Sequence, residues 1–199
     1  RRILVEDGRA VGVETADGRR VKASFVVSNA SAGQTFGGLV SPGELAAVAP
    51  DFMGRLRGLE ISISGMSVYL GVDLDVKHLG ITNFLTVVHE SLDFEKEWEA
   101  ASQGRLADVF FSFCFPTLLD PSLAPPQKHI IHIFTMAPFY LPGREWSRQE
   151  KTRLTKVMLQ KVERVLPGLS RHIVVQDAAT PRTQERYTLN TEGALIGWA

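Results

Sequence analysis

Two Asp-Gly dipeptides near the start of the chain constrain its fold more than any other feature. Asp7-Gly8 and Asp17-Gly18 each interrupt a run in which apolar and polar residues alternate. Asp-Gly favours tight turns whose central residues need positive φ, so it joins short antiparallel strands. The apolar members of the alternation are Ile3, Val5, Val11, Val13, Val21, Ala23, Phe25 and Val27. Residues 1–31 are therefore predicted to form a small three-stranded β-meander.

The remaining residues, 32–199, are predicted to form an α+β unit. Ser41-Pro42-Gly43-Glu44 and the pair Ser147 and Glu150 are helix N-cap signals, and Asp93 can cap a third helix. The first helix should end at Pro50 and the second near 166. Strand-like runs cover 61–72, 81–89, 108–115, 129–137 and 172–178. Because strands outnumber helices and do not alternate regularly with them, we expect a mixed, largely antiparallel sheet with a few helices on one face.

Composition excludes several classes of protein. The 22 basic and 22 acidic residues cancel, which argues against nucleic acid as a partner. Cys114 is the single cysteine, so no internal disulfide forms and a reducing compartment such as the cytoplasm is expected. No apolar run approaches the roughly 20 residues of a membrane span, and no signal peptide is visible. The terminal residues read as parts of structured segments, so we expect the chain to be a piece of a longer protein.

No self-contained catalytic apparatus is visible. His129 and His132 form an H-x-x-H pair, but residues three apart in a strand point to opposite faces, so a shared metal is not expected. Cys114 lies among phenylalanines and is predicted to be an inert buried thiol. No nucleophile elbow and no carboxylate dyad are present. We therefore predict no catalytic and no metal-ligating residue.

The stretch VKASFVVSNAS, residues 21–31, is a candidate for cofactor contact. An apolar, β-branched run ends abruptly in Ser28-Asn29-Ala30-Ser31, as strands do beside a bound nucleotide cofactor. Such an ending is also common in any β-rich domain. The chain has no glycine-rich fingerprint that could hold a pyrophosphate.

Several stretches, in order, resemble flavin-dependent oxidoreductases of the phytoene desaturase type. The first is GRAVGVETADGRRVKASFVVSNAS, with its V-x-G-V-x-x-x-D-G meander and A-x-x-V-V-S-N-A ending. The second is DPSLAPPQKHIIHIF, in which Gln127 stands where that family usually has glycine. The third contains T-P-x-T-x-E-R-Y and G-A-x-x-G-W elements similar to the carotenoid isomerase and retinol saturase branch. We expect Gln127 to change a turn conformation rather than the chemistry.

The resemblance implies FAD in the intact protein and a redox or isomerisation reaction on an apolar polyene. It implies that residues 1–31 belong to the FAD-binding domain and 32–199 to the substrate-binding domain. Ser28, Asn29 and Ala30 would lie near the FAD. The family's two glycine-rich flavin-binding segments are not in this sequence, so the chain by itself is expected to bind no FAD and to be inactive. Candidate walls for the polyene, with core packing as the alternative for each, are Phe139, Tyr140, Trp146 and Trp198.

Two functional hypotheses follow. In the first, the chain is the substrate-domain fragment of an FAD-dependent desaturase, saturase or isomerase acting on a carotenoid- or retinoid-like polyene. In the second, it is a noncatalytic α+β module that binds an apolar ligand or a partner protein. Apolar surface uncovered by absent neighbours should make the chain self-associate. Peripheral membrane contact of the intact protein stays open.

Overall fold

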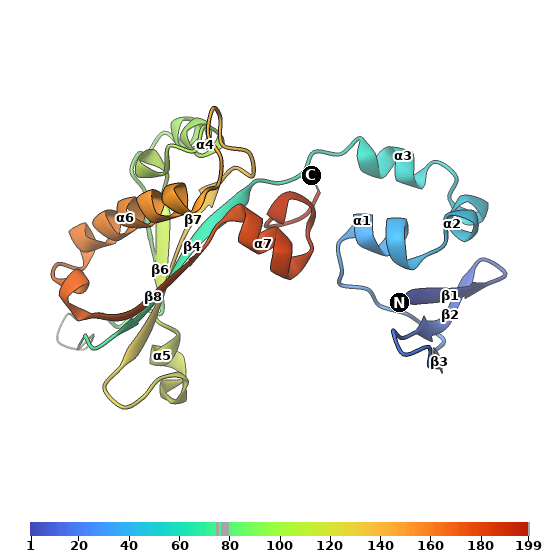
Figure 1. Ribbon diagram of the computed structural model, residues 1–199, viewed down its shortest axis with the longest axis horizontal. Coiled ribbons are helices and arrows are strands. Elements are labelled where there is room, and N and C mark those ends of the chain that lie inside the picture. The colour runs from blue at the N-terminus through green and yellow to red at the C-terminus, as the bar shows by residue number, and fades with distance from the viewer. Residues whose placement is uncertain (75, 77–79, 199) are drawn as a thin grey trace.

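The computed structural model describes residues 1–74, 76 and 80–198, which form two parts (Figure 1). One part contains the N-terminal strands and the helices α1 to α3. The other contains a five-stranded sheet with α4, α5 and α6, and α7 lies between the two parts. The boundary predicted between residues 31 and 32 stays a prediction.

The N-terminal meander is confirmed. Its strands β1 (Arg2–Glu6), β2 (Arg9–Glu14) and β3 (Arg20–Lys22) pair antiparallel in the order β1-β2-β3. Asp7 and Gly8 in the first turn have φ values of 48° and 74°, the positive values that this type of hairpin requires. The alternation predicted through Phe25 and Val27 does not continue as a strand. These two side chains are 88% and 94% exposed, so no other described residue packs over them.

Short helical segments follow the meander. They are α1 (Ala32–Gln34), a π-helical turn (Thr35–Leu39), α2 (Pro42–Val48) and α3 (Phe52–Arg57). The predicted capping box is present at the start of α2, where the Ser41 hydroxyl accepts from the Glu44 N–H. Helix α3 was not predicted.

The second part is built on one antiparallel sheet. Its strands are β4 (Ser64–Val72), β5 (Leu85–Val88), β6 (Phe111–Cys114), β7 (His129–Ala137) and β8 (Ile173–Ala179), in the order β5-β6-β7-β4-β8. The predicted α+β class is confirmed. Every described pairing is antiparallel, so the mixed character that we expected is absent from the described strands.

The long helix α6 (Arg148–Val165) lies across the sheet (Figure 1) and seals one of its faces. Leu154, Met158 and Val162 of this helix are fully buried against the alternate apolar residues of the strands. The strand residues of this core are Met66, Val68, Leu70, Val72, Phe111, Phe113, Ile131 and Ile133. Because strand side chains alternate between faces, the residues between these project from the opposite face of the sheet.

Three shorter helices lie at the ends of the sheet. Helix α4 (Phe94–Ser102) is capped by Asp93 as predicted, and α5 (Pro116–Leu119) follows β6. Helix α7 (Pro181–Thr188) was not predicted, although Thr180 and Thr183 form a capping box and Pro181 occupies its first turn. Ala100 and Ala101 of α4 pack near Met136, so this helix covers one end of the face opposite α6.

The chain enters and leaves the second part of the fold at neighbouring points. Ile61 forms an isolated antiparallel bridge with Trp198, and the Ser62 N–H donates to the Gly197 carbonyl at 2.9 Å. Among the described residues, no helix combines the length and the apolar character that crossing a membrane requires.

Candidate functional site

The face of the sheet opposite α6 is the candidate site, and we call it the open face. It consists of the outward side chains of the five strands. Near its centre lie half-buried residues of β6 and β7, and at its β5 edge Leu85 and Val87 are 52% and 50% exposed. Its apolar members are Leu85, Val87, Ile130, Phe134, Met136 and Val175. A half-exposed apolar surface of this kind suits an apolar ligand.

A glycine in β4 fixes the shape of the open face. A Cβ atom on Gly65 would lie 2.3 Å from the Phe134 ring, so the ring packs directly on the β4 backbone. The sequence predicted either a bulge or a close approach at Gly65, and the structure shows the close approach. Phe134 is half-buried there, with its ring over the β4 backbone.

One polar cluster lies within this apolar face. His132 of β7 stacks on Tyr69 of β4, with ring centroids 4.9 Å apart and an interplanar angle of 8°. The His132 Nε2 atom lies 3.0 Å from the Ser67 hydroxyl, and its Nδ1 atom lies 4.0 Å from the Cys114 sulfur. Cross-strand register explains the grouping, because His132 pairs directly with Tyr69 on one side and with Cys114 on the other.

The cluster is uncharged at neutral pH. Burial lowers the pKa of His132 below its ordinary value near 6.5, so the imidazole is neutral. Burial also raises the pKa of the Cys114 thiol, against a smaller opposing contribution from its contact with His132. Cys114 is half-buried on the open face rather than enclosed in the core, so the predicted burial is only partial, and the predicted inertness of the thiol stays a prediction.

A cavity of about 490 Å³ adjoins the end of the open face near α4. Phe94, Trp98 and Phe110 line it, together with Met136 of the open face and His89. Phe94 and Trp98 are 63% and 52% exposed, so this aromatic group is accessible from solvent. The open face therefore continues into an aromatic hollow.

Glu97 anchors the loop that borders this hollow. Its buried carboxylate accepts from the backbone N–H groups of Glu90 (2.8 Å) and Ser91 (3.2 Å) and lies 2.8 Å from the His89 Nδ1 atom. Burial works to raise the pKa of Glu97, but these hydrogen bonds outweigh it and hold the pKa below the ordinary value.

The three predicted cofactor neighbours lie beside the meander. All three are exposed; Ser28 and Ala30 line a cavity of about 420 Å³ between β1, β2 and α2, and Asn29 is not part of its lining. The Ser28 hydroxyl is already engaged by the Thr35 hydroxyl at 2.7 Å. The cavity offers small and apolar side chains with few polar atoms, which fits one wall of a flavin site and not a pyrophosphate site.

The predicted polyene walls separate into two places. Phe139, Tyr140 and Trp146 lie together around a cavity of about 360 Å³ that Arg144 and Arg182 also line. The Arg182 guanidinium lies 4.0 Å from the centroid of the Phe139 ring, a cation–π contact. Their role in binding a polyene stays a prediction.

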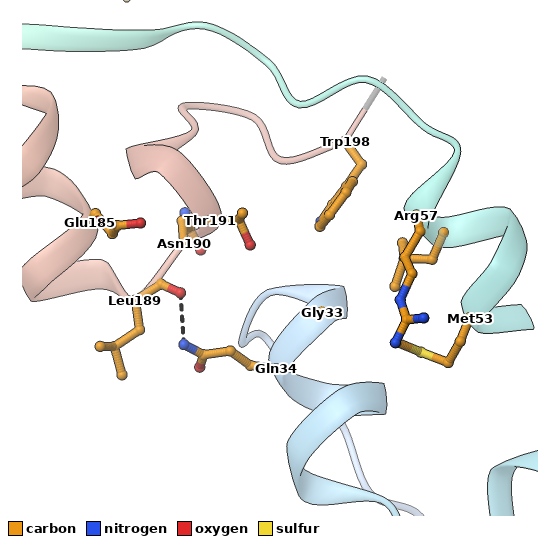
Figure 2. A pocket seen from close by; sticks show the side chains of 10 residues that line it. Gly33, Gln34, Met53, Arg57, Glu185, Leu189, Asn190, Thr191 and Trp198 are labelled. Atoms are coloured by element: carbon orange, nitrogen blue, oxygen red, sulfur yellow. Dashed lines mark hydrogen bonds between the residues drawn. The ribbon is translucent and has the colours of Figure 1, made fainter. Parts of the chain in front are cut away.

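Trp198 lies elsewhere, in the cavity shown in Figure 2. This cavity, of about 430 Å³, separates α1 and α3 from the segment after α7. The Trp198 ring projects into it above Gly33, where a Cβ would meet the ring at 3.5 Å. On the opposite side the Gln34 amide donates to the Leu189 carbonyl at 2.7 Å, which ties the two parts of the chain together.

Sequence reasoning missed the open face itself. It treated His132 only as half of a metal pair, and it rejected Ser67 as a nucleophile because the stretch 65–69 lacks the second glycine of a nucleophile elbow and lies within a strand. The expectation that His129 and His132 lie on opposite faces agrees with the structure, where His129 contacts Thr117 and His132 contacts Ser67. The alternation in β4 and β7 places Ser67, Tyr69 and His132 on one face of the sheet, but the cross-strand register that brings them together is set by tertiary packing. Within residues 1–74, 76 and 80–198 no three His, Cys, Asp or Glu side chains are grouped as a metal site requires.

The chain is similar in sequence to a segment of several known proteins. The chain is 30% identical over 195 residues to the chloroplastic prolycopene isomerase of Arabidopsis thaliana, covering 96% of this chain and 31% of that protein. It is 26% identical over 189 residues to the neurosporene-forming phytoene desaturase of Rhodobacter capsulatus, covering 93% of this chain and 36% of that protein. The chain is a homologue of a segment of these proteins. The recognition made from the sequence motifs is thereby confirmed.

A third relative and a solved structure extend the comparison to another protein and to the fold. Pyridine nucleotide-disulfide oxidoreductase domain-containing protein 2 of Mus musculus is 29% identical over 196 residues, covering 90% of this chain and 33% of that protein. The crystal structure of an oxidoreductase from Methanosarcina mazei matches 89% of this chain and 35% of its own with a TM-score of 0.53 and 19% identity, a likeness of fold alone. The chain matches no protein-family model. It spans about a third of the length of the relatives named here.

Proposed function

We propose that this chain is the substrate-holding part of an FAD-dependent oxidoreductase or isomerase that acts on a carotenoid- or retinoid-like polyene. The observation that carries the proposal is the sheet with one face sealed by α6 and the other lined by half-exposed apolar side chains. Relatives named as a prolycopene isomerase and a phytoene desaturase support a polyene as the ligand class.

The chain's own residues would orient the polyene and exclude water from it. The open face offers apolar side chains along the sheet and an aromatic hollow at its α4 end. We propose that four aromatic side chains make additional contacts with the polyene: Phe139, Tyr140, Trp146 and Trp198. A long apolar ligand gains roughly 25 cal/mol for each Å² of apolar surface that it buries, so it needs few polar contacts.

FAD, when bound, would supply the electron chemistry. The described residues contribute to it at most one wall, formed by Ser28 and Ala30 with the apolar side chains beside them. The chain has no glycine-rich strand-turn-helix for the pyrophosphate. We therefore propose that the chain by itself binds no FAD and has no activity. A flavin absorbance band in the purified chain would overturn this part.

The second candidate is a noncatalytic module that binds an apolar ligand or a partner protein. The open face favours it to the same extent, since holding an apolar ligand there needs no flavin. A longer protein that contains this chain distinguishes the two candidates. If that protein binds FAD and converts a polyene, the first holds, and if it binds polyenes without flavin or turnover, the second holds.

Polyene binding to the chain tests the open face directly. Lycopene in detergent micelles should quench the fluorescence of Trp98, which lines the hollow, in a saturable manner. Leu85→Glu places a charge on the open face and should weaken binding at least about tenfold. Val165→Glu is the matched control. Val165 is 40% exposed on α6, which covers the other face of the sheet, so this variant should bind the polyene like the wild type.

Equal effects of the two substitutions would contradict the assignment of the open face. The absence of saturable quenching in the wild type would contradict polyene binding by this chain. Far-ultraviolet circular dichroism of both variants should match the wild type, which shows that the comparison concerns folded proteins.

A further inference from the structure

The cluster on the open face contains more polar groups than an apolar ligand requires. A site for a pure hydrocarbon is served by apolar side chains throughout. Here Tyr69, His132, Ser67 and Cys114 meet across three adjacent strands near the middle of the sheet. Polar side chains on a surface that a ligand covers lose contact with water, which costs free energy unless the ligand bonds them.

The orientation of His132 is fixed from several sides. Its Nε2 atom is engaged by the hydroxyl of Ser67, a residue that is only 2% exposed, and its ring is stacked on Tyr69. The remaining contact, from Nδ1 to the Cys114 sulfur at 4.0 Å, is a weak one that a ligand oxygen can replace. The cluster is thus an ordered set of hydrogen-bonding groups.

Tyr69 carries the accessible polar atom of the cluster. The residue is 41% exposed, and its phenol oxygen makes no hydrogen bond with the part of the chain that the structure describes. The phenol can donate a hydrogen bond and accept one. It is therefore suited to an oxygen atom on a ligand that lies along the open face.

The charge of the cluster limits which oxygen-bearing end groups of a ligand can bind to it. The cluster is neutral, since burial keeps His132 and Cys114 uncharged, and none of its members is a cation. Asp177 of β8 pairs with Tyr69 in register at the sheet edge, but its side chain is 80% exposed and its carboxylate lies 3.4 Å from Lys151 of α6, on the other side of the sheet. An anionic end group that lost its hydration on the open face would find no cation in the cluster to compensate for that loss. A hydroxyl or carbonyl group fits these surroundings better than a carboxylate does.

We propose that Tyr69 and His132 bind a neutral oxygen of the polyene, so that the open face selects hydroxyl- or carbonyl-bearing polyenes over hydrocarbons and over acids. This inference rests on the proposed function, because it assumes that a polyene occupies the open face. In this proposal the cluster determines ligand specificity by direct contact with the ligand.

Three small polyenes with the same carbon skeleton test the proposal on the chain as it stands. Retinol carries a hydroxyl group, axerophthene is the hydrocarbon without it, and retinoic acid carries a carboxylate. Their dissociation constants are measured by quenching of tryptophan fluorescence. Retinol should bind about 3- to 10-fold more tightly than axerophthene, the gain from one or two hydrogen bonds, and more tightly than retinoic acid.

Tyr69→Phe is the decisive variant, because it removes one exposed oxygen atom and keeps the stack on His132. It should weaken retinol binding to the level of axerophthene and leave axerophthene binding unchanged. His132→Phe should act in the same direction. Because it also removes the partner of the buried Ser67 hydroxyl, it is interpreted only alongside Tyr69→Phe.

The outcomes separate the inference from the proposed function. If the three ligands bind equally well, the specificity proposal is overturned while the apolar site stands. If retinol is preferred and Tyr69→Phe keeps that preference, the assignment to this cluster is overturned. If none of the three binds the wild-type chain, the open face is not a polyene site and the proposed function fails.

Discussion

Single residues hold strained or buried positions that a pattern of apolar residues does not show. Gln127 stands in the DPSLAPPQK loop with φ of 61°, in the left-handed region that favours glycine. The family resemblance predicted a changed turn conformation there. The structure instead keeps the conformation that glycine would adopt, so the consequence of the substitution is strain.

Replacing this residue should relieve that strain. Gln127→Gly is expected to raise the free energy of unfolding by about 0.5–1 kcal/mol, because the left-handed penalty of about 1–2 kcal/mol exceeds the extra chain entropy of glycine. Urea denaturation measures the change. Gln127→Ala is the control, and it should give no gain because alanine keeps the Cβ atom. A loss of stability in the glycine variant would contradict the account of the loop.

How far the sequence predicts the site depends on the residue. Gly65 signalled a close backbone approach because an isolated glycine inside a strand pattern usually marks either a bulge or a tightly packed neighbour. Tyr69 and His132 gave no such signal, since their association depends on the register of β4 with β7. Those strands are separated by two others along the chain, and the pairing is set by tertiary packing of the sheet.

At the scale of elements, a buried carboxylate joins α4 to the strand edge. Glu97 holds the backbone of Glu90 and Ser91 and contacts His89, so it connects the helix to the loop that follows β5. A charged acceptor in such a network is worth about 1.5–3 kcal/mol for each hydrogen bond when one partner is removed. The pKa of Glu97, held below its ordinary value, makes this connection sensitive to acid.

Glu97→Gln should therefore reduce stability most at neutral pH. A carboxyl group whose pKa is depressed by folding stabilises the native state above its unfolded pKa, and this contribution is lost as the pH falls through the folded pKa. The variant should be destabilised by about 1–3 kcal/mol near pH 7, with the difference shrinking below about pH 4. Urea denaturation of both proteins across this range measures it. A difference that does not vary with pH would show that shape rather than charge matters.

Elements differ in how well the sequence predicts them. Helices α2 and α6 begin at capping boxes or N-cap serines that local patterns reveal. Helix α7 also begins at a capping box, formed by Thr180 and Thr183, but its apolar stripe is too short to stand out. Segment 81–89 forms a strand only from Leu85, because pairing with β6 extends no further than Cys114.

At the scale of the whole molecule, apolar surface is exposed well beyond the open face. Phe25, Val27, Leu92 and Ile196 are each at least 88% exposed. Large exposed apolar patches drive association between proteins. We therefore expect the chain to form dimers or larger species as its concentration rises.

Sedimentation velocity over a range of concentrations measures this association. Phe25→Ser combined with Val27→Ser should shift the chain toward monomer without loss of stability, because neither side chain contributes to the described core. A clean monomer at high concentration in the wild type would contradict the expectation.

The bridge between Ile61 and Trp198 has a consequence for protein engineering. Because Ile61 and Trp198 are paired, the segment between them begins and ends at adjacent points of the fold. Units of this kind tolerate excision and grafting, because a short linker can close the gap without distorting the host. We expect residues 62–197 to serve as an exchangeable cassette, which should carry the proposed ligand preference from one related protein to another.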